Sequence, residues 1–364
     1  GAVNSGAADV SLLVSDGGAL GVGDTADDST ITSAEFQRVT ANNLTVGGGA
    51  SGNITVDNLT AAVTANITTN VTFDAGGNGA DVTFANNGSS FRTVTARADD
   101  AVFVNANLAS TIGAISLVAD TDGLPDAVDN VVIGAGVVLA PGAALNISSA
   151  DGLTFIDDFN ISVPLTLNAD NDNDGVGTFT INATKTVNTV NNSLTIIASD
   201  FVVNGTLNSG TASTTLNATN GRTIGVGATA RVITISNAEL QRIIATNLTI
   251  GGVNAGNITV DNIASGVDLA TIAGTLTVDA GGANAAIDLS TNASSFKGLT
   301  LNAQAGVTLN VNAITTGATI IDADTDNNGV GDFTVVGGRV LTSGGALSIT
   351  ANDMILSGTV SSGA

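Results

Sequence analysis

The chain has 364 residues, 45 of them Gly, and its 32 acidic against 9 basic side chains give a formal net charge of −23. Such an acidic surface repels nucleic acid and anionic lipid, so neither is expected as a partner. Neither Cys nor His occurs in the sequence, which excludes disulfides, thiolate or imidazole catalysis and the usual zinc ligands.

Hydrophobic residues make up 43% of the chain, but with 11 Phe and no Trp or Tyr the core must consist mainly of small aliphatic side chains. Short β-branched runs separated by Gly and Asn predict an all-β fold. The longest apolar stretch, residues 131–145, is broken by Gly and Pro and is shorter than the roughly 18 to 20 residues of a spanning helix, so no direct membrane insertion is expected. Residues 1–9 lack the pattern of a signal peptide, and we expect any export signal to be removed or to lie upstream.

In chain order, the first element with helical character is a short corner that begins at Ser33 and recurs at residues 237–242. We expect Ser33, and the Asn at the equivalent place in the second copy, to cap this corner. Glu35 stands three residues before Arg38, a spacing that favours a local ion pair in each copy. Phe36 and its counterpart should then point inward.

Short strands follow, in which Thr alternates with aliphatic residues; the clearest span residues 53–57, 70–74, 81–84 and 274–279. The alternation places Ile54 and Val56 on one face and Thr on the other. Runs of four to five residues are too short for a stable sheet, but stacked coils pair each strand with its equivalent in the next coil about 4.8 Å away. The sequence therefore predicts a parallel β-solenoid made of tandem repeats, with coils of roughly 20 to 25 residues.

Internal duplication is the strongest signal in the sequence. Segments within residues 31–58 recur within residues 235–262, at an offset of 204 (235 − 31). Residues 170–179 resemble residues 324–333, at an offset of 154 (324 − 170). Because the two offsets differ, the first copy carries an additional module, as stacked coils allow.

The repeats define the expected domain organisation as one continuous solenoid. Residues 1–204 form a first long repeat with an extra Asp-rich module, residues 205–357 a second, shorter repeat, and residues 358–364 the start of a further repeat. The last seven residues resemble the first seven, and neither end has the polar cap that closes a self-contained solenoid. We expect head-to-tail self-association or continuation in a longer chain.

Three segments, residues 52–56, 247–252 and 346–351, resemble the repeats of filamentous-haemagglutinin-type adhesins and related giant β-helical surface proteins of bacteria. The resemblance implies a secreted, right-handed parallel β-helix that acts in adhesion and biofilm cohesion. It also implies an extracellular or cell-surface location, where a surface glycan or a protein would be the ligand.

Three Asp-rich loops carry the candidate metal ligands. Their D-x-D-x-[DN]-G spacing arranges alternate oxygens around one centre while Gly permits a sharp turn, a pattern that suits calcium. The candidate ligands are Asp120, Asp122 and Asp126 in the first loop, Asp170, Asp172 and Asp174 in the second, and Asp322, Asp324, Asp326, Asn328 and Asp332 in the third. The twelfth position counted from Asp170 is Ile181, so the bidentate acid of an EF-hand is missing and water or a neighbouring coil would complete the site. An ordinary Asx-rich turn that needs no metal is the alternative.

Catalysis is not expected, and no catalytic or cofactor-binding residues are assigned. β-Helical lyases and glycosidases use an inward-facing acid pair or a base beside calcium, usually with aromatic platforms for sugar. The adjacent carboxylates Asp99-Asp100 and Asp157-Asp158 should point to opposite faces of a strand and so share no site. Only two lysines occur in the chain.

The sequence thus predicts a non-catalytic structural segment of an extracellular fibre, adhesin stalk or surface layer, joined end to end, with calcium as a candidate stiffener. An ice-binding or polysaccharide-binding solenoid is the first alternative. Flat Thr-x-Thr rows on every coil would distinguish it, whereas most Thr here stand singly between apolar neighbours. A β-helical polysaccharide lyase is the second alternative.

Overall fold

A computed structural model of the chain describes residues 1–122 and 130–363. This part of the chain consists of short strands with two helices of four residues each. It divides into two compact units: unit 1 contains residues 1–153 and 163–172, and unit 2 contains residues 154–162 and 173–364. The strand pairings within each described unit are parallel and follow the order of the coils, so the predicted parallel β-solenoid is confirmed.

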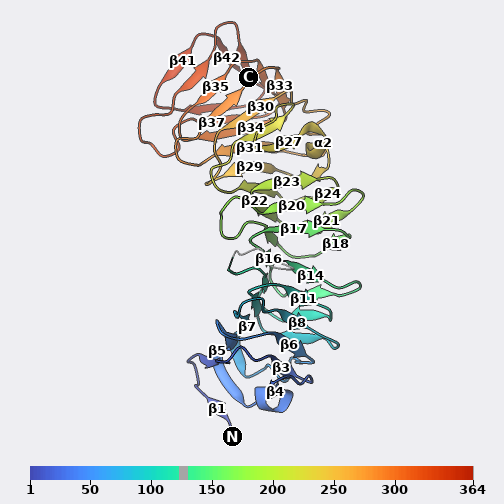
Figure 1. Ribbon diagram of the computed structural model, residues 1–364. Helices are drawn as coiled ribbons and strands as arrows, with labels where there is room; N and C mark the ends of the chain where they lie inside the picture. Colours follow the sequence, from blue (N-terminus) through green and yellow to red (C-terminus); the bar gives the residue numbers. More distant parts are fainter. Residues whose placement is uncertain (123–129, 364) are drawn as a thin grey trace. The chain divides into compact units, whose positions relative to one another are not determined.

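Unit 1 builds three sheets from its coils (Figure 1). The long sheet contains β1 (Val3–Asn4), β2 (Val10–Leu12), β5 (Val39–Gly48), β7 (Ile67–Ala75), β10 (Val94–Ala98), β13 (Ile115–Val118), β16 (Leu145–Ser148) and β19 (Leu165–Asn168). The second sheet contains β3 (Leu20–Gly23), β4 (Ser29–Thr32), β6 (Ile54–Asp57), β8 (Val82–Phe84), β11 (Val102–Val104) and β14 (Val131–Ile133). The third contains β9 (Ser89–Phe91), β12 (Leu108–Ser110) and β15 (Leu139–Ala140). One coil therefore visits the three sheets in turn.

Unit 2 repeats this arrangement, and the boundary between the units falls within β17 (Gly152–Phe155). Its long sheet contains β22 (Leu194–Ala198), β25 (Thr214–Ala218), β29 (Leu248–Gly252), β31 (Thr275–Ala280), β34 (Gly298–Ala303), β37 (Thr319–Asp322) and β40 (Leu347–Thr350). A second sheet contains β26 (Ile224–Gly227), β27 (Ile233–Ser236), β30 (Ile258–Asp261), β32 (Ile287–Leu289), β35 (Val307–Leu309), β38 (Phe333–Val335) and β41 (Met354–Leu356). The remaining strands are β18 (Phe159–Asn160), β20 (Thr178–Ile181), β21 (Thr186–Asn188), β23 (Asp200–Val203), β24 (Thr206–Asn208), β28 (Ile243–Ile244), β33 (Ser294–Phe296), β36 (Ala313–Thr315), β39 (Val340–Ser343) and β42 (Thr359–Ser362).

The interior is a set of columns in which like residues stack from coil to coil. Leu248 pairs with Leu276, which in turn pairs with Leu299, and all three are at most 1% exposed. The predicted alternation is confirmed, since Ile54 and Val56 in β6 are fully buried. Parallel pairing in register is what brings these side chains together, because each strand then offers the same face to the next.

The coils are less uniform than the sequence suggests. In the long sheets Leu145 pairs with Leu165, whereas Thr214 pairs with Leu248, so the second of these coils is much longer than the first. The predicted coil length therefore matches the shortest coils and underestimates the longest. The additional residues of the longest coil in unit 2 form β26, β27 and a helix, which lie between β25 and β29 in the chain.

Three phenylalanines fill the centre of one coil in unit 1. Phe73 in β7 meets Phe84 in β8 edge to face, with ring centroids 6.0 Å apart, and meets Phe91 in β9 at 5.6 Å. All three are at most 1% exposed. The three sheets therefore enclose one common interior at this level.

The two helical corners are α1 (Ser33–Phe36) and α2 (Asn237–Leu240), but two predicted details of these corners are wrong. The N-cap of α1 is Thr32, one residue before Ser33, and its hydroxyl accepts from the Glu35 N–H while Glu35 accepts from the Thr32 N–H. Glu35 thus completes a capping box instead of pairing with Arg38. The inward position of Phe36 is confirmed, since it is fully buried.

Glycine is required where a strand of one coil passes close to the backbone of the next. Gly251 at the end of β29 has φ +120°, and a Cβ atom at this position would lie 2.0 Å from the carbonyl oxygen of Asp279. No other residue fits such an approach without displacing the backbone. Gly47 occupies the equivalent position in the first copy, with φ +102° and the same approach to Asp74.

Candidate functional site

The second Asp-rich loop holds the closest group of carboxylates. One oxygen from each of Asp170, Asp172 and Asp174 lies within 4.8 Å of the others, and no other group of acidic residues in the described parts of the chain comes together in this way. Asp170 is buried, whereas the other two carboxylates are exposed. Three carboxylates at this separation form a donor set that a hard cation such as Ca²⁺ accepts.

Neighbouring side chains occupy other oxygens of this loop. The Asn220 side chain donates to the carbonyl of Asp174, and the Arg222 guanidinium donates to the carbonyl of Gly175. The Val176 N–H donates to Oδ1 of Asp174 at 2.7 Å. A cation here would therefore have three carboxylates and water as ligands, fewer protein ligands than a complete calcium loop supplies.

The third Asp-rich loop is organised by its own hydrogen bonds. Both carboxylate oxygens of Asp324 accept backbone N–H groups, from Asn328 at 3.2 Å and from Gly329 at 3.2 Å. Asn328 also donates to Asp326 at 2.8 Å, and Asp322 accepts the Asp324 N–H. These are the bonds of an Asx-rich turn, which was the alternative to calcium binding at this place.

Other candidate ligands are dispersed. Asp332 accepts from the Asn352 side chain at 3.3 Å. In the first loop Asp120 is fully buried and accepts the Asp151 N–H at 3.0 Å, while Asp122 is exposed. The candidate ligand Asp126 lies outside the described residues.

The adjacent carboxylates differ from their predicted placement on strands. Asp99 and Asp100 follow the end of β10 in a bend, and both are largely buried instead of facing opposite sides of a strand. Asp157 and Asp158 lie in the turn before β18, where Asp157 forms an ion pair with Lys185 at 3.0 Å and Asp158 accepts a backbone N–H. Each of these carboxylates interacts with a group other than the carboxylate next to it in the sequence.

Burial shifts the pKa values of three carboxyl groups on the strands and loops. It raises the pKa of Asp81, Asp200 and Asp279 above their ordinary value, because the charged form loses solvation. At Asp279 burial is the single cause. These three groups are spread over different coils, so they do not form a shared acid and base pair.

A column of mainly hydroxyl-bearing residues runs along the outer face of each long sheet, which we call the Thr column. In unit 1 it contains Ser11, Thr45, Thr72, Thr95, Ser116, Asn146 and Thr166. In unit 2 it contains Thr195, Thr215, Thr249, Thr277, Thr300, Ile320 and Ser348. The members are in register, so their spacing is that of parallel strands, about 4.8 Å.

Sequence reasoning missed this column because its members belong to different strands that lie far apart in the chain. The Thr-x-Thr pair Thr275 and Thr277 in β31 has Gly298 beside Thr275 in the next strand, so the pair does not continue as a row. Asn70 ties the column in unit 1 by donating to Thr72 at 3.0 Å and to Thr95 at 3.3 Å. The outer face therefore carries a single line of mainly hydroxyl-bearing residues, interrupted by Asn146 in unit 1 and by Ile320 in unit 2.

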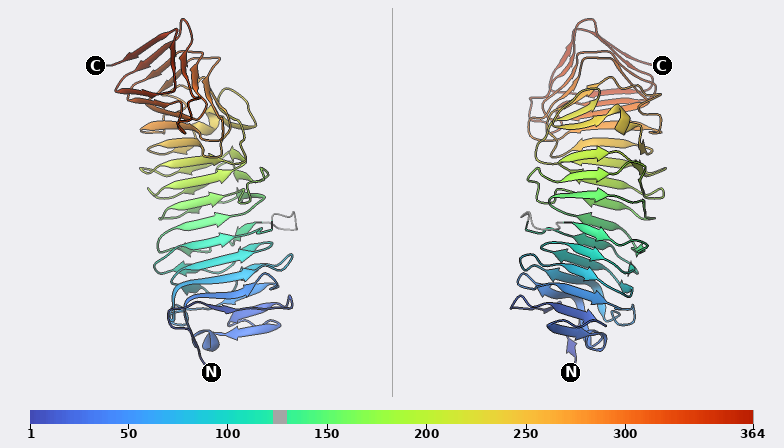
Figure 2. Two further views of the ribbon diagram at one scale, coloured as in Figure 1. Left: turned by 90° about the vertical axis from the view of Figure 1, so that its left-hand side faces the viewer. Right: turned by 45° about the vertical axis from the view of Figure 1, so that its right-hand side comes forward.

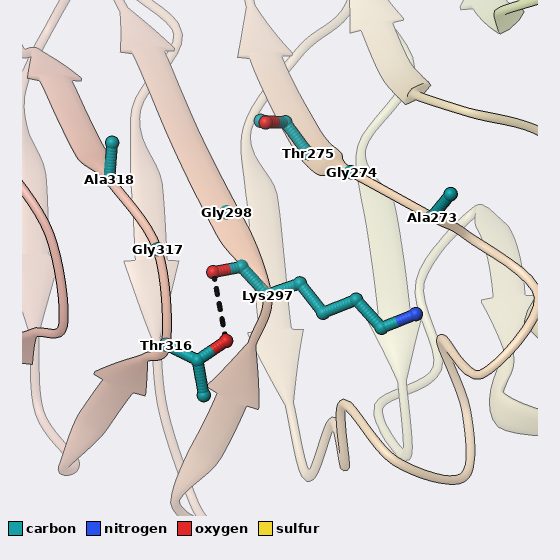
Figure 3. A pocket seen from close by; sticks show the side chains of 8 residues that line it. All are labelled: Ala273, Gly274, Thr275, Lys297, Gly298, Thr316, Gly317 and Ala318. Atoms are coloured by element: carbon teal, nitrogen blue, oxygen red, sulfur yellow. Dashed lines mark hydrogen bonds between the residues drawn. The ribbon is translucent and has the colours of Figure 1, made fainter.

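A shallow hollow of about 400 Å³ on unit 2 is lined by Ala273, Gly274, Thr275, Lys297, Gly298, Thr316, Gly317 and Ala318 (Figure 3). The Lys297 side chain extends across it, and Nζ donates to the carbonyl of Ile272 at 2.6 Å and to that of Ala270 at 3.3 Å. The lining contains no carboxylate that could act as an acid or a base. Lys297 therefore links two neighbouring coils through these hydrogen bonds.

Comparisons with models of protein families, with characterised proteins and with solved structures find no match to this chain. In the described residues no helix is long and apolar enough to cross a membrane. The functional conclusion consequently depends on the fold and on the chemistry of its surfaces.

Proposed function

We propose that the chain is a non-catalytic structural segment of an extracellular fibre, adhesin stalk or surface layer. The observation that carries the proposal is the repetition of coils whose inward-facing positions stack into buried, mainly aliphatic columns, such as Leu248, Leu276 and Leu299. Such a fold gains its stability by adding levels, and it presents repeated surfaces along its length. This suits a spacer or scaffold.

The surface chemistry supports this role. The formal charge of −23 keeps the sides of neighbouring molecules apart, which favours soluble, separate solenoids over lateral aggregation. The carboxyl groups whose pKa values burial raises, Asp81, Asp200 and Asp279, lie apart on different coils, so these described residues form no acid and base pair that would argue for catalysis. A surface glycan or a protein is the class of ligand that such a stalk would present or bind.

Immunogold electron microscopy tests the location and the role. Antibodies raised against this chain should label filaments or a continuous layer outside the cells that produce it, and pre-immune serum should not. Label confined to the cell interior would refute the proposal. Incubation with acidic polysaccharides and calcium, followed by detection of unsaturated products, tests the alternative of a lyase.

Calcium is part of the proposal at the second Asp-rich loop. We expect Asp170, Asp172 and Asp174 to bind the ion weakly, and at ten times the dissociation constant linkage gives about 1.4 kcal/mol of added stability. The variant Asp172→Asn/Asp174→Asn should lose both calcium binding in calorimetry and the rise in melting temperature. Asp326→Asn in the third loop is the matched control, and absence of binding at millimolar calcium would refute the site.

An ice-binding or polysaccharide-binding role is the second candidate, because the Thr column offers hydroxyls at a regular spacing. Thermal hysteresis and co-sedimentation with insoluble polysaccharides measure the two activities. Thr277→Lys should abolish either activity, while Thr308→Lys on the second sheet of unit 2 should retain it. Equal effects of the two substitutions would exclude the Thr column as the binding face.

A further inference from the structure

The sequence contains five Asn-Gly pairs, and an asparagine that precedes glycine can react with its own backbone. The glycine nitrogen attacks the side-chain amide carbon of the asparagine, because glycine has no Cβ atom that hinders the approach. The nitrogen must first lose its proton, and an N–H that donates a hydrogen bond does so only after that bond opens. The hydrogen bonding of each glycine N–H therefore distinguishes protected pairs from reactive ones.

Four of the five pairs are protected in this way. The glycine N–H donates to Asp99 in Asn78-Gly79, to the Ile181 carbonyl in Asn204-Gly205, to the Asn254 carbonyl in Asn220-Gly221 and to Asp324 in Asn328-Gly329, at 2.8, 3.2, 2.9 and 3.2 Å. In two of these pairs the acceptor is a carboxylate, whose negative charge further opposes the loss of a proton from the nitrogen.

Asn87-Gly88 is the unprotected pair. Both residues are exposed, and they lie in the turn between β8 and β9 of unit 1. The Gly88 N–H forms no hydrogen bond with any other described residue. Water and hydroxide therefore have access to a backbone nitrogen that is free to react.

The side-chain amide of Asn87 links two neighbouring coils. β8 pairs with β6 of the coil before it, as the stacked strands show (Figure 2). At the end of β6, Asp57 is only 3% exposed, and its Oδ1 accepts the Asn87 N–H at 2.9 Å and Nδ2 of Asn87 at 3.1 Å. Loss of this amide would remove a donor from a buried carboxylate.

The second copy repeats this contact with one change. Asn292 donates the same two groups to Oδ1 of Asp261, at 2.9 and 3.1 Å. The next residue is Ala293, whose N–H likewise forms no hydrogen bond with another described residue. Its methyl group hinders the attack that Gly88 permits. The chain thus contains a matched control for the reactive pair.

We infer that Asn87 is a site of spontaneous conversion to aspartate and isoaspartate, and that this conversion weakens the contact between the coils of β6 and β8. Hydroxide removes the proton from the Gly88 nitrogen, which then bonds to Cγ of Asn87. The Cγ–Nδ2 bond breaks, and ammonia leaves with a proton taken from water. Water next adds to either carbonyl of the resulting succinimide ring and opens it. The product carboxylate cannot donate to Asp57 and repels it.

Tandem mass spectrometry of the folded chain, incubated near pH 8, measures the conversion of each asparagine. Asn87 should convert at least fivefold faster than the asparagine of any other Asn-Gly pair and faster than Asn292. In chain unfolded by urea the five pairs should convert at similar rates, because the bonds that protect four of them are lost. Equal rates in the folded chain would overturn the inference. So would an Asn87 that stays intact while the unfolded chain converts.

Two reciprocal substitutions test the chemistry, since each gives one copy the residue of the other. Gly88→Ala should slow the conversion of Asn87 to the rate of Asn292. Ala293→Gly should accelerate the conversion of Asn292 at least fivefold. Far-ultraviolet circular dichroism of both variants should match that of the wild type. An unchanged rate at Asn292 in the folded Ala293→Gly variant would refute the role of the free glycine N–H.

The substitution Asn87→Asp imitates one product and tests the effect on the fold. It should lower the midpoint of thermal unfolding, whereas Asn204→Asp, at an exposed asparagine outside this contact, should not. Equal midpoints for Asn87→Asp and the wild type would show that the contact between the coils does not depend on this amide and would overturn that part of the inference. None of these results bears on the structural role, which the labelling of cell-surface structures tests separately.

Discussion

The substitution Phe73→Ala in unit 1 is the most direct test of the enclosed core. Phe73 is fully buried between the three sheets and touches Phe84 and Phe91, so its removal leaves a cavity bordered by two aromatic rings. Phe→Ala in a protein core costs about 3 to 5 kcal/mol. Thr72→Ala, one residue away on the outer face of β7, should cost no more than about 0.5 kcal/mol.

Hydrogen exchange followed by mass spectrometry gives the spatial extent of this loss. Because each coil contacts mainly its neighbours, amides of β5, β7 and β10 should lose protection in the Phe73→Ala variant while those of β19 keep it. Uniform loss across unit 1 would contradict this local coupling.

A double-mutant cycle tests whether the three sheets share one interior. Phe73→Leu and Phe91→Leu should show a coupling free energy of about 0.5 to 1.5 kcal/mol in urea unfolding, because their rings meet edge to face at 5.6 Å. Phe103 faces outward from β11, so Phe103→Leu should be additive with Phe73→Leu. Zero coupling between Phe73 and Phe91 would refute the enclosed core.

Three further variants in unit 2 test individual features, and each is measured by its midpoint of urea unfolding. Gly251→Ala should lower the free energy of unfolding by about 2 to 4 kcal/mol, because of the positive φ and the nearby Asp279 carbonyl. Gly266→Ala, where no atom lies within 4 Å of the added Cβ, should change the free energy of unfolding little. Asp279→Asn should raise the midpoint of urea unfolding near pH 7. Burial raises the pKa of Asp279, so the ionised carboxylate lowers the stability of the wild type at neutral pH. The wild type regains this stability as the pH falls through the raised pKa. The difference in midpoint between the variant and the wild type should therefore vanish near pH 3. Thr315→Val/Thr319→Val removes a buried pair of hydroxyls 2.8 Å apart and should leave the free energy of unfolding nearly unchanged. A decrease of more than about 2 kcal/mol would show that this pair stabilises the coil.

The strands could be predicted from the sequence because their signal is local. The expected strand at 70–74 lies within β7, and the expected strand at 274–279 corresponds to β31 with one residue of difference at each end. Aliphatic residues alternate with Thr there, and Gly or Asn marks the turns, so the face that each side chain adopts follows from the strand alone. Parallel stacking then follows from the repeats.

The corner at α1 shows a signal that was present and misinterpreted. Thr32-Ser-Ala-Glu35 is a capping box, S/T-x-x-E, and it recurs as Ser236-Asn-Ala-Glu239. The prediction instead interpreted the spacing of Glu35 and Arg38 as an ion pair. In solution a local exposed ion pair contributes little, whereas a cap satisfies backbone donors that have no other partner.

The Thr column and the coil lengths could not be predicted in this way, because both depend on register between distant segments. Thr249 and Thr277 belong to different coils, and the sequence of neither strand indicates that the two residues are neighbours. A coil closes where its three sheets meet, so a loop can lengthen without moving the strands. That freedom accounts for coils as different as the short one from Leu145 to Leu165 and the long one from Thr214 to Leu248.

The acidic residues of this chain act largely as acceptors between coils. Asp57 accepts the N–H and the side-chain amide of Asn87 in the next coil, and Asp261 accepts the same two groups of Asn292. In both copies a buried carboxylate accepts hydrogen bonds from a turn of the next coil. A high content of Asp is therefore expected in a solenoid whose turns need acceptors, even where no cation binds. Among the described residues, the candidate cation sites reduce to the one loop in which the three carboxylates Asp170, Asp172 and Asp174 converge.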